Sequence, residues 1–119
     1  MGQHSATAAR ALGDRTLVDA VVADWRSAPV APGLKATLGL LEKLTLRPSE
    51  LSGADVEAVR AAGVSDAAIE DAIHVAASFV MINKLADAFA WEILDDDVYD
   101  MRAAVALERG YAIPPQALE

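Results

Sequence analysis

Two histidines are the residues of this sequence best suited to acid–base chemistry, and His74 has the richer surroundings. On a helix, Glu70 and Asp71 lie one turn before His74, and Ser78 lies one turn after it on the same stripe. A carboxylate beside an imidazole orients the ring and raises its pKa, so His74 is a candidate general base. The simpler interpretation, which we favour, is a core or interface histidine whose ring nitrogens bond to these neighbours.

The sequence contains few potential metal ligands and no thiol. The 119 residues contain no cysteine, which excludes disulfides, thiolate nucleophiles and cysteine-ligated metals within this sequence. A zinc site needs several ligands, and a single histidine among carboxylates is a poor match. The acidic run from Glu92 to Asp100 lacks the glycine and the terminal glutamate of an EF-hand loop. We interpret that run as a solvated helix start and expect no metal and no cofactor.

The element that must position His74 is a long helix, which we expect from Ser65 to Trp91. Ser65 is a good N-cap, acidic residues follow it, and no proline or glycine interrupts the segment. Its middle, from Ala72 to Ile82, is apolar nearly all the way round, which is typical of a buried helix. So short a chain offers few helices to cover it, so we expect neighbours from another subunit and hence a homo-oligomer.

Five shorter helices are predicted around the long one. Glycines, prolines or acidic caps at their ends mark their limits. They span residues 5–12, 15–27, 34–46, 54–62 and 96–109. No alternation typical of a strand is present. The predicted fold is therefore all-α, a bundle of about five to six helices around one long buried helix, in a single domain over residues 1–119.

Charge and hydropathy limit the partners and the location. The net charge of −8 disfavours binding to nucleic acid or to an anionic membrane surface. No signal peptide is visible, and the longest apolar run is shorter than the ~18 residues that span a bilayer. We therefore expect no nucleic acid and no membrane partner, and a cytoplasmic location.

Several blocks of the sequence together resemble a known family. They are His4 to Gly13 (HSATAARALG), Leu40 to Pro48 (LLEKLTLRP), Asp55 to Asp66 (DVEAVRAAGVSD) and Ile82 to Ala88 (INKLADA). This pattern is similar to the alkylhydroperoxidase-D-like, or peroxidase-related, branch of the carboxymuconolactone decarboxylase family. The likeness covers nearly the whole chain. Inside the long helix, Phe79 and Asn83 match the family pattern whereas Val80 and Lys84 depart from it.

The resemblance implies an all-helical, oligomeric fold and a thiol chemistry. In that branch a Cys-x-x-Cys pair reduces peroxide, and a histidine that follows after three residues takes part in a proton relay. His4 matches the relay histidine, which would put the second cysteine just before Met1. We therefore expect the chain to be the C-terminal portion of such a protein. Its reductant partner is not identified.

Three candidate functions follow from these observations. The first is a protein related to thiol-dependent, peroxide-reducing oxidoreductases but without their redox cysteines in this chain, so that whether it acts as an enzyme is open. The second is a non-catalytic helical homo-oligomer or interaction module. The third is a thiol-independent lactone decarboxylase that uses His74 as base.

Overall fold

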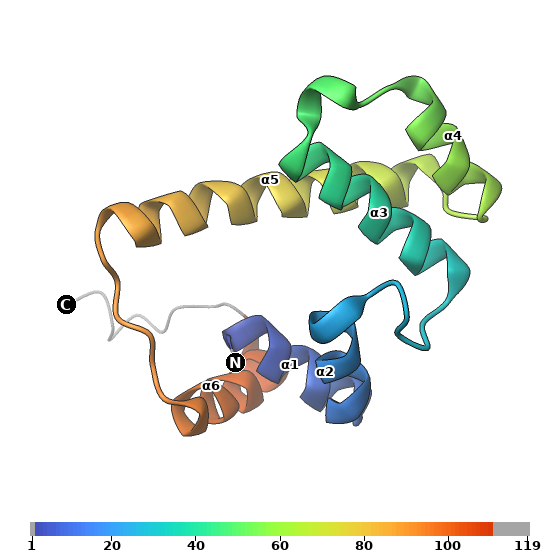
Figure 1. Cartoon of the computed structure of the whole chain (residues 1–119). Helices are drawn as coiled ribbons and strands as arrows, with labels where there is room; N and C mark the ends of the chain where they lie inside the picture. The colour runs from blue at the N-terminus through green and yellow to red at the C-terminus, as the bar shows by residue number, and fades with distance from the viewer. Residues whose placement is uncertain (1, 111–119) are drawn as a thin grey trace. The chain divides into compact units, whose positions relative to one another are not determined.

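The computed structural model describes residues 2–110 and is helical throughout most of them (Figure 1). In chain order the elements are α1 (Gln3–Leu12), α2 (Arg15–Asp24), α3 (Pro32–Leu46), the 3-10 turn η1 (Pro48–Glu50), α4 (Gly53–Ala61), α5 (Asp66–Ala88) and α6 (Asp96–Arg109). Within residues 2–110 there is no strand. The predicted all-α class and the predicted number of helices are confirmed for this part of the chain.

The chain divides into two compact units. Unit 1 comprises Met1–Ala28 and Ile93–Glu119, and unit 2 is the continuous segment Pro29–Glu92. Unit 1 is therefore built from both ends of the chain, and unit 2 from its middle. The expected single domain over residues 1–119 stays a prediction.

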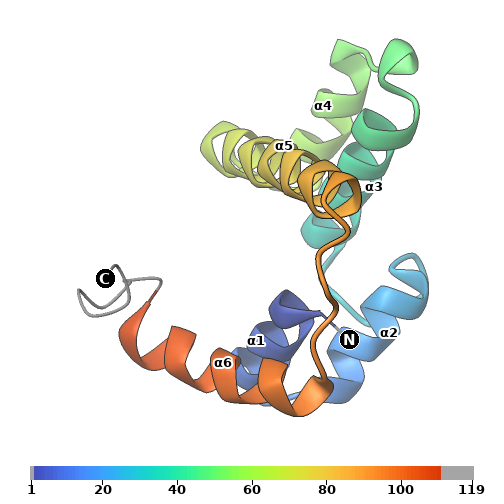
Figure 2. The ribbon, with the colours of Figure 1, turned by 90° about the vertical axis from the view of Figure 1, so that its left-hand side faces the viewer.

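In unit 1, α2 and α6 both pack against α1 (Figure 2). Ala6 and Ala9 of α1 and Ala103 of α6 are the buried side chains of these two helices. Because alanine ends at Cβ, it lets the two helix backbones approach closely. Gly13 ends α1 with a φ of 66°, in the left-handed region that glycine favours. Asp14 caps the next helix, since its carboxylate accepts from the backbone N–H of Leu17 at 2.9 Å. A glycine terminator and an acidic cap at these helix ends are as the sequence predicted.

Unit 2 has its own small core at the crossing of three helices. Leu40 of α3, Val59 of α4 and Ile69 of α5 are each at most 4% exposed and pack together. An ion pair on the edge of this core joins α3 to α4, with Lys43 Nζ 2.7 Å from Asp55 Oδ1. The first turns of α5 are thereby fixed against α3 and α4.

Several helix limits differ from those predicted, and two of the differences have clear local reasons. We expected the second helix to continue to Ser27, but α2 ends at Asp24. The Asp24 carboxylate accepts from the backbone N–H of Arg26 at 3.1 Å, so the side chain competes with helix continuation. We also placed Pro32 in a connector, whereas it begins α3. Proline suits that position because its fixed φ fits a helix and its missing N–H is not needed there.

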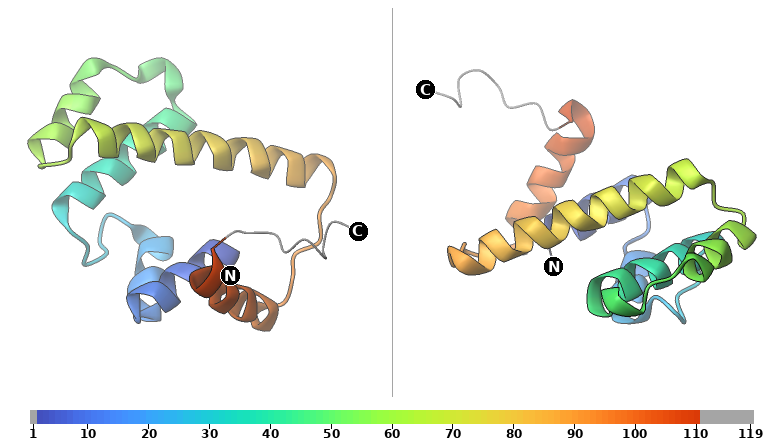
Figure 3. Two further views of the ribbon diagram at one scale, coloured as in Figure 1. Left: turned by 180° about the vertical axis from the view of Figure 1, so that it is seen from behind. Right: turned by 90° about the horizontal axis from the view of Figure 1, so that it is seen from above.

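The long helix is shorter than expected, and its burial within the single chain is limited. It stops at Ala88 instead of Trp91, since Ala90 takes a φ of 49° and the Trp91 N–H bonds back to the Ala86 carbonyl at 3.0 Å. In the single chain Ile69 is the one buried residue of α5, so the burial of the long helix, which we expected to need neighbours from another subunit, stays a prediction. Figures 1 and 3 show the reason: α3 and α4 lie along the N-terminal half of α5, and its C-terminal half extends beyond them.

Candidate functional site

His74 lines a small hollow on unit 2, on the side of α5 that faces α4. The hollow has a volume of about 250 Å³ and is walled by residues of these two helices. Its lining is Val56, Arg60, Asp66, Ile69, Glu70, Ile73 and His74. We call it the His74 hollow. The structure thus brings the predicted His74 and Glu70 to one hollow, while Asp71 is not among the residues that line it.

Arg60 dominates the electrostatics of the His74 hollow. Its Nε lies 2.6 Å from Asp66 Oδ1 and its Nη2 lies 3.1 Å from Asp66 Oδ2, a two-point pairing between α4 and the start of α5. Its Nη1 also bonds to Glu57 on the same helix. These hydrogen bonds, first from Asp66 and then from Glu57, raise the pKa of Arg60, and the same guanidinium lowers the pKa of Asp66. Arg60 was not singled out in the sequence, because only the turn between α4 and α5 brings it to Asp66.

The His74 imidazole is exposed to solvent and is not held by its neighbours. Among the described residues it forms no hydrogen bond or ion pair with Glu70 or Asp71. The Ser78 hydroxyl, which we expected at a ring nitrogen, instead donates to the backbone carbonyl of His74 at 2.9 Å. An imidazole without an orienting carboxylate lacks the arrangement by which proteins fix a general base. Among the described residues, the His74 hollow does not present an assembled proton relay.

His4 lies in the first turn of α1, in unit 1, and is exposed. A hollow of about 420 Å³ in the same unit does not include His4. Its lining is Ala6, Ala9, Arg10, Gly13, Arg15 and Asp100. In it Arg15 Nη1 lies 3.5 Å from Asp100 Oδ2, an exposed pair that links α2 to α6. The two candidate histidines thus belong to different units. The relay role of His4, which came from the resemblance alone, stays a prediction.

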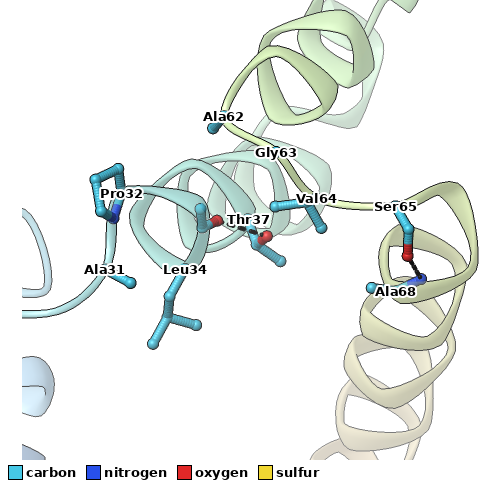
Figure 4. A pocket seen from close by; sticks show the side chains of 10 residues that line it. Ala31, Pro32, Leu34, Thr37, Ala62, Gly63, Val64, Ser65 and Ala68 are labelled. Carbon is cyan, nitrogen blue, oxygen red and sulfur yellow. Dashed lines mark hydrogen bonds between the residues drawn. The ribbon is translucent and has the colours of Figure 1, made fainter.

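A larger, mostly apolar hollow lies between the start of α3 and the start of α5 (Figure 4). It measures about 730 Å³. Figure 4 shows Pro32 and Leu34 on one side and Ser65 and Ala68 on the other, with Val64 between them. The turn before α5 closes tightly on α3 here, since a Cβ added to Gly33 would lie 3.0 Å from the Val64 side chain. We call this the α3–α5 hollow. Its polar side chains form hydrogen bonds with the backbone in the first turns of helices. For example, Ser65 Oγ accepts from the Ala68 N–H at 3.2 Å.

The most distinctive surface of the described residues is the C-terminal half of α5. Val75 is 57% exposed, Met81 61%, Ile82 49% and Leu85 42%. Between Val75 and Ala86 the only charged side chain is Lys84. Exposed apolar side chains that gather on one stretch of a helix are typical of surfaces that bind proteins, membranes or ligands.

Comparison with known proteins adds no assignment. No protein-family model matches the chain, and no curated protein matches it significantly. In residues 2–110, no cluster of three or more histidine or acidic side chains is arranged to hold a metal ion. No helix of the described part of the chain is both long and apolar enough to cross a bilayer. The suspected membership of the carboxymuconolactone decarboxylase family therefore stays a prediction.

Proposed function

We propose that this chain is a self-assembling helical subunit and that another copy covers the C-terminal half of α5. The observation that carries the proposal is the exposure of Val75, Met81, Ile82 and Leu85 along about three turns of one helix. The sequence pattern of this helix is that of a buried element, and the chain's own core reaches only its first half. A second copy supplies apolar surface of the same kind.

The hydrophobic effect is large enough to drive such an assembly. Fully burying one side chain of this size is worth about 1.5–3 kcal/mol. Six large apolar side chains of this stretch are partly exposed: Val75, Phe79, Val80, Met81, Ile82 and Leu85. Burial of their exposed halves stabilises the assembly by roughly 5–9 kcal/mol per copy, and by about twice that for two copies. The loss of translational and rotational freedom on association costs about 4–15 kcal/mol. The apolar gain is thus of the same size as the cost of association, so burial of this surface is large enough to offset it.

Light scattering on the purified chain tests this proposal. The unmodified protein is expected to have a mass at least twice the 12.5 kDa of one chain. The Ile82→Asp variant, which buries a charge at the interface, is expected to be monomeric. Ala58→Asp is the matched control, because it adds the same charge at an exposed position on α4. A monomeric unmodified chain at about 100 μM, where even a weak dimer forms, would contradict the proposal.

We further propose that the resemblance to alkylhydroperoxidase-D-like proteins is one of fold and not of thiol chemistry in these 119 residues. A peroxide-reducing thiolate needs cysteine, which the sequence lacks. The chain is therefore expected to consume no hydroperoxide above background when a dithiol reductant is supplied. Turnover that saturates with peroxide would refute this expectation.

A cytoplasmic location likewise stays a prediction.

The alternative of a thiol-independent lactone decarboxylase has one observation in its favour, the shared hollow of His74 and Glu70. A general base there would lose its activity in His74→Ala and keep it in His4→Ala. We rank this alternative below self-assembly, because the imidazole is exposed and makes no bond to either neighbouring carboxylate.

A further inference from the structure

The long helix α5 ends at a left-handed residue that is not a glycine. Ala90 has a φ of 49°, and among residues 2–110 no other residue apart from glycine takes a positive φ. The remaining positive φ angles belong to Gly13, Gly63 and Gly110. A Cβ atom in this conformation crowds the following carbonyl oxygen, which disfavours alanine roughly tenfold relative to glycine. Strain of this kind is concentrated at functional sites, including segments that switch between conformations.

Two backbone hydrogen bonds hold the bend at Ala90. The Trp91 N–H donates to the Ala86 carbonyl at 3.0 Å. The Ala90 N–H donates to the Asp87 carbonyl at 3.3 Å. This pair of bonds is the Schellman motif, which usually has glycine at the position of Ala90. The bend therefore satisfies two carbonyl groups in the last turn of α5, while it leaves one residue strained.

The residues that follow α5 do not by themselves end a helix. Residues 89–94 (FAWEIL) contain neither proline nor glycine. In a continued helix each N–H donates to the carbonyl four residues earlier. The N–H groups of Ala90 and Trp91 would therefore exchange their two acceptors, and neither hydrogen bond would be lost.

One charge opposes a longer helix. If α5 continues through Glu92, that carboxylate lies in the last turn, where the helix dipole disfavours negative charge. The dipole effect is a factor of about two to five in the equilibrium, against roughly tenfold for the strain at Ala90. Because the two effects act in opposite directions, the bent and the continued helix are close in free energy.

We propose that the end of α5 is a two-state hinge, in which Ala90 either is left-handed, as described above, or joins a helix that continues through Glu92. We call residues 89–93 the Ala90 hinge. The hinge is limited on its far side by Leu94, whose N–H donates to the Tyr99 hydroxyl of α6 at 3.1 Å. This inference does not depend on the proposed self-assembly, because it concerns the backbone within one chain.

The Ala90 hinge changes the length of one of the two chain connections between the units. Unit 2 ends at Glu92, so the hinge lies where the chain returns to unit 1. The four residues 89–92 span about 6 Å as a helix and up to about 14 Å when extended. The other connection enters unit 2 at Pro29, whose ring fixes φ and whose missing N–H disfavours a helix interior. The connection after α5 is thus the one suited to a change in length.

Replacement of Ala90 by glycine separates the two states. Glycine relieves the strain of the bent state and weakens the helical state, so Ala90→Gly is expected to raise the ratio of bent to helical chains at least about tenfold. The carbon-13 chemical shifts of the α-carbons measure that ratio, since helical residues shift in a characteristic direction. In the unmodified chain residues 89–92 are expected to give values between helix and turn, and in Ala90→Gly turn values. The urea midpoint of Ala90→Gly is expected to rise.

Ala88→Gly is the matched control, because Ala88 is exposed and is the last residue of α5. No strain is relieved there, so glycine is expected to lower the urea midpoint. Glu92→Lys acts on the hinge in the other direction, because a positive charge in the last turn favours the longer helix. It is expected to move the shifts of residues 89–91 towards helical values and to lower the ratio of bent to helical chains about threefold to tenfold.

The two measurements together distinguish the hinge from a fixed helix end. A higher midpoint of Ala90→Gly with unchanged shifts shows a single bent state and overturns the proposal. If the midpoint of Ala90→Gly does not rise, Ala90 is not strained and the proposal is likewise overturned. The expected result is a higher midpoint of Ala90→Gly together with opposite displacements of the shifts in Ala90→Gly and Glu92→Lys.

Discussion

At the scale of single residues, Asp55 does more for the described structure than either candidate histidine. Its carboxylate accepts from the Lys43 ammonium on α3 at 2.7 Å and from the Ser52 backbone N–H at 2.8 Å. One side chain therefore both starts α4 and ties it to α3. Ser52 and Asp55 form a capping box at the start of that helix, a local pattern that can be recognised in the sequence, whereas the bond to Lys43 cannot. His74, by contrast, forms no hydrogen bond or ion pair with Glu70 or Asp71.

Replacement of Asp55 by asparagine tests this assignment through pH. The hydrogen bond from Lys43, followed by that from Ser52, lowers the pKa of Asp55. The carboxylate therefore stabilises the fold above its unfolded pKa of about 3.9, and the effect is lost as the pH falls through the lower folded-state pKa. Asp55→Asn is expected to lower the melting temperature by a few degrees at pH 7 and to differ little from the unmodified chain near pH 2.

Thermal unfolding followed by circular dichroism across that pH range measures the effect of Asp55→Asn. Asp87→Asn serves as the control, because Asp87 makes no ion pair among the described residues and is exposed. An equal loss of stability in both variants would show that Asp55 acts only through net charge.

At the scale of elements, α3 and the turn between α4 and α5 determine where α5 begins. Gly33, in the first turn of α3, allows that turn to approach: an added Cβ would lie 3.0 Å from Val64 Cγ2 and 3.3 Å from the Ala62 carbonyl oxygen. Gly63 supplies the reversal itself, with a φ of 86°. The α3–α5 hollow and the first turn of α5 are both consequences of this close approach.

Gly33 and Gly53 both lie at the start of a helix. Replacing each by alanine separates the effect of steric crowding on stability from the effect of helix propensity. Gly33→Ala is expected to destabilise the chain by about 1–3 kcal/mol, because the Ala62 backbone oxygen cannot move aside easily. Gly53→Ala is the matched control at the start of α4, where an added Cβ meets nothing within 4 Å. It is expected to be neutral or to stabilise by up to about 1 kcal/mol. Urea unfolding compares them, and equal effects would contradict the close approach.

At the scale of the whole molecule, net charge and apolar surface act in opposite directions on assembly. Each chain carries a net charge of −8, so two copies repel each other at long range. In the proposed assembly the attraction at short range comes from the exposed half of α5, in which Lys84 is the only lysine or arginine.

Salt is therefore expected to strengthen assembly. Raising sodium chloride from about 50 mM to about 500 mM screens the repulsion between subunits and is expected to lower the dissociation constant roughly threefold to tenfold. Analytical ultracentrifugation at several protein concentrations measures it. Ile82→Asp is the control and is expected to stay monomeric at both salt concentrations. Weaker assembly of the unmodified chain at high salt would point to an interface held by ion pairs instead of apolar contacts.

The sequence by itself determined the helices of this protein, because their signals are local. Caps and terminators such as Asp14, Gly13 and Gly110 act on the backbone within one turn, so the limits of α6 were predicted to the residue. The resemblance to a family and the roles it implies for His4 stay predictions, since nothing within the described residues tests them.

Only the tertiary structure decided which faces of those helices are covered. The apolar circumference of α5 predicted a buried helix, but α3 and α4 reach only its first half, and helix length in a sequence does not say how far the neighbouring helices extend. The pairing of Arg60 with Asp66 and the approach of Gly33 to Val64 likewise depend on how α4 turns back on α3. Contacts between residues far apart in sequence follow from packing, which no local pattern encodes, and the uncovered side of α5 is their result.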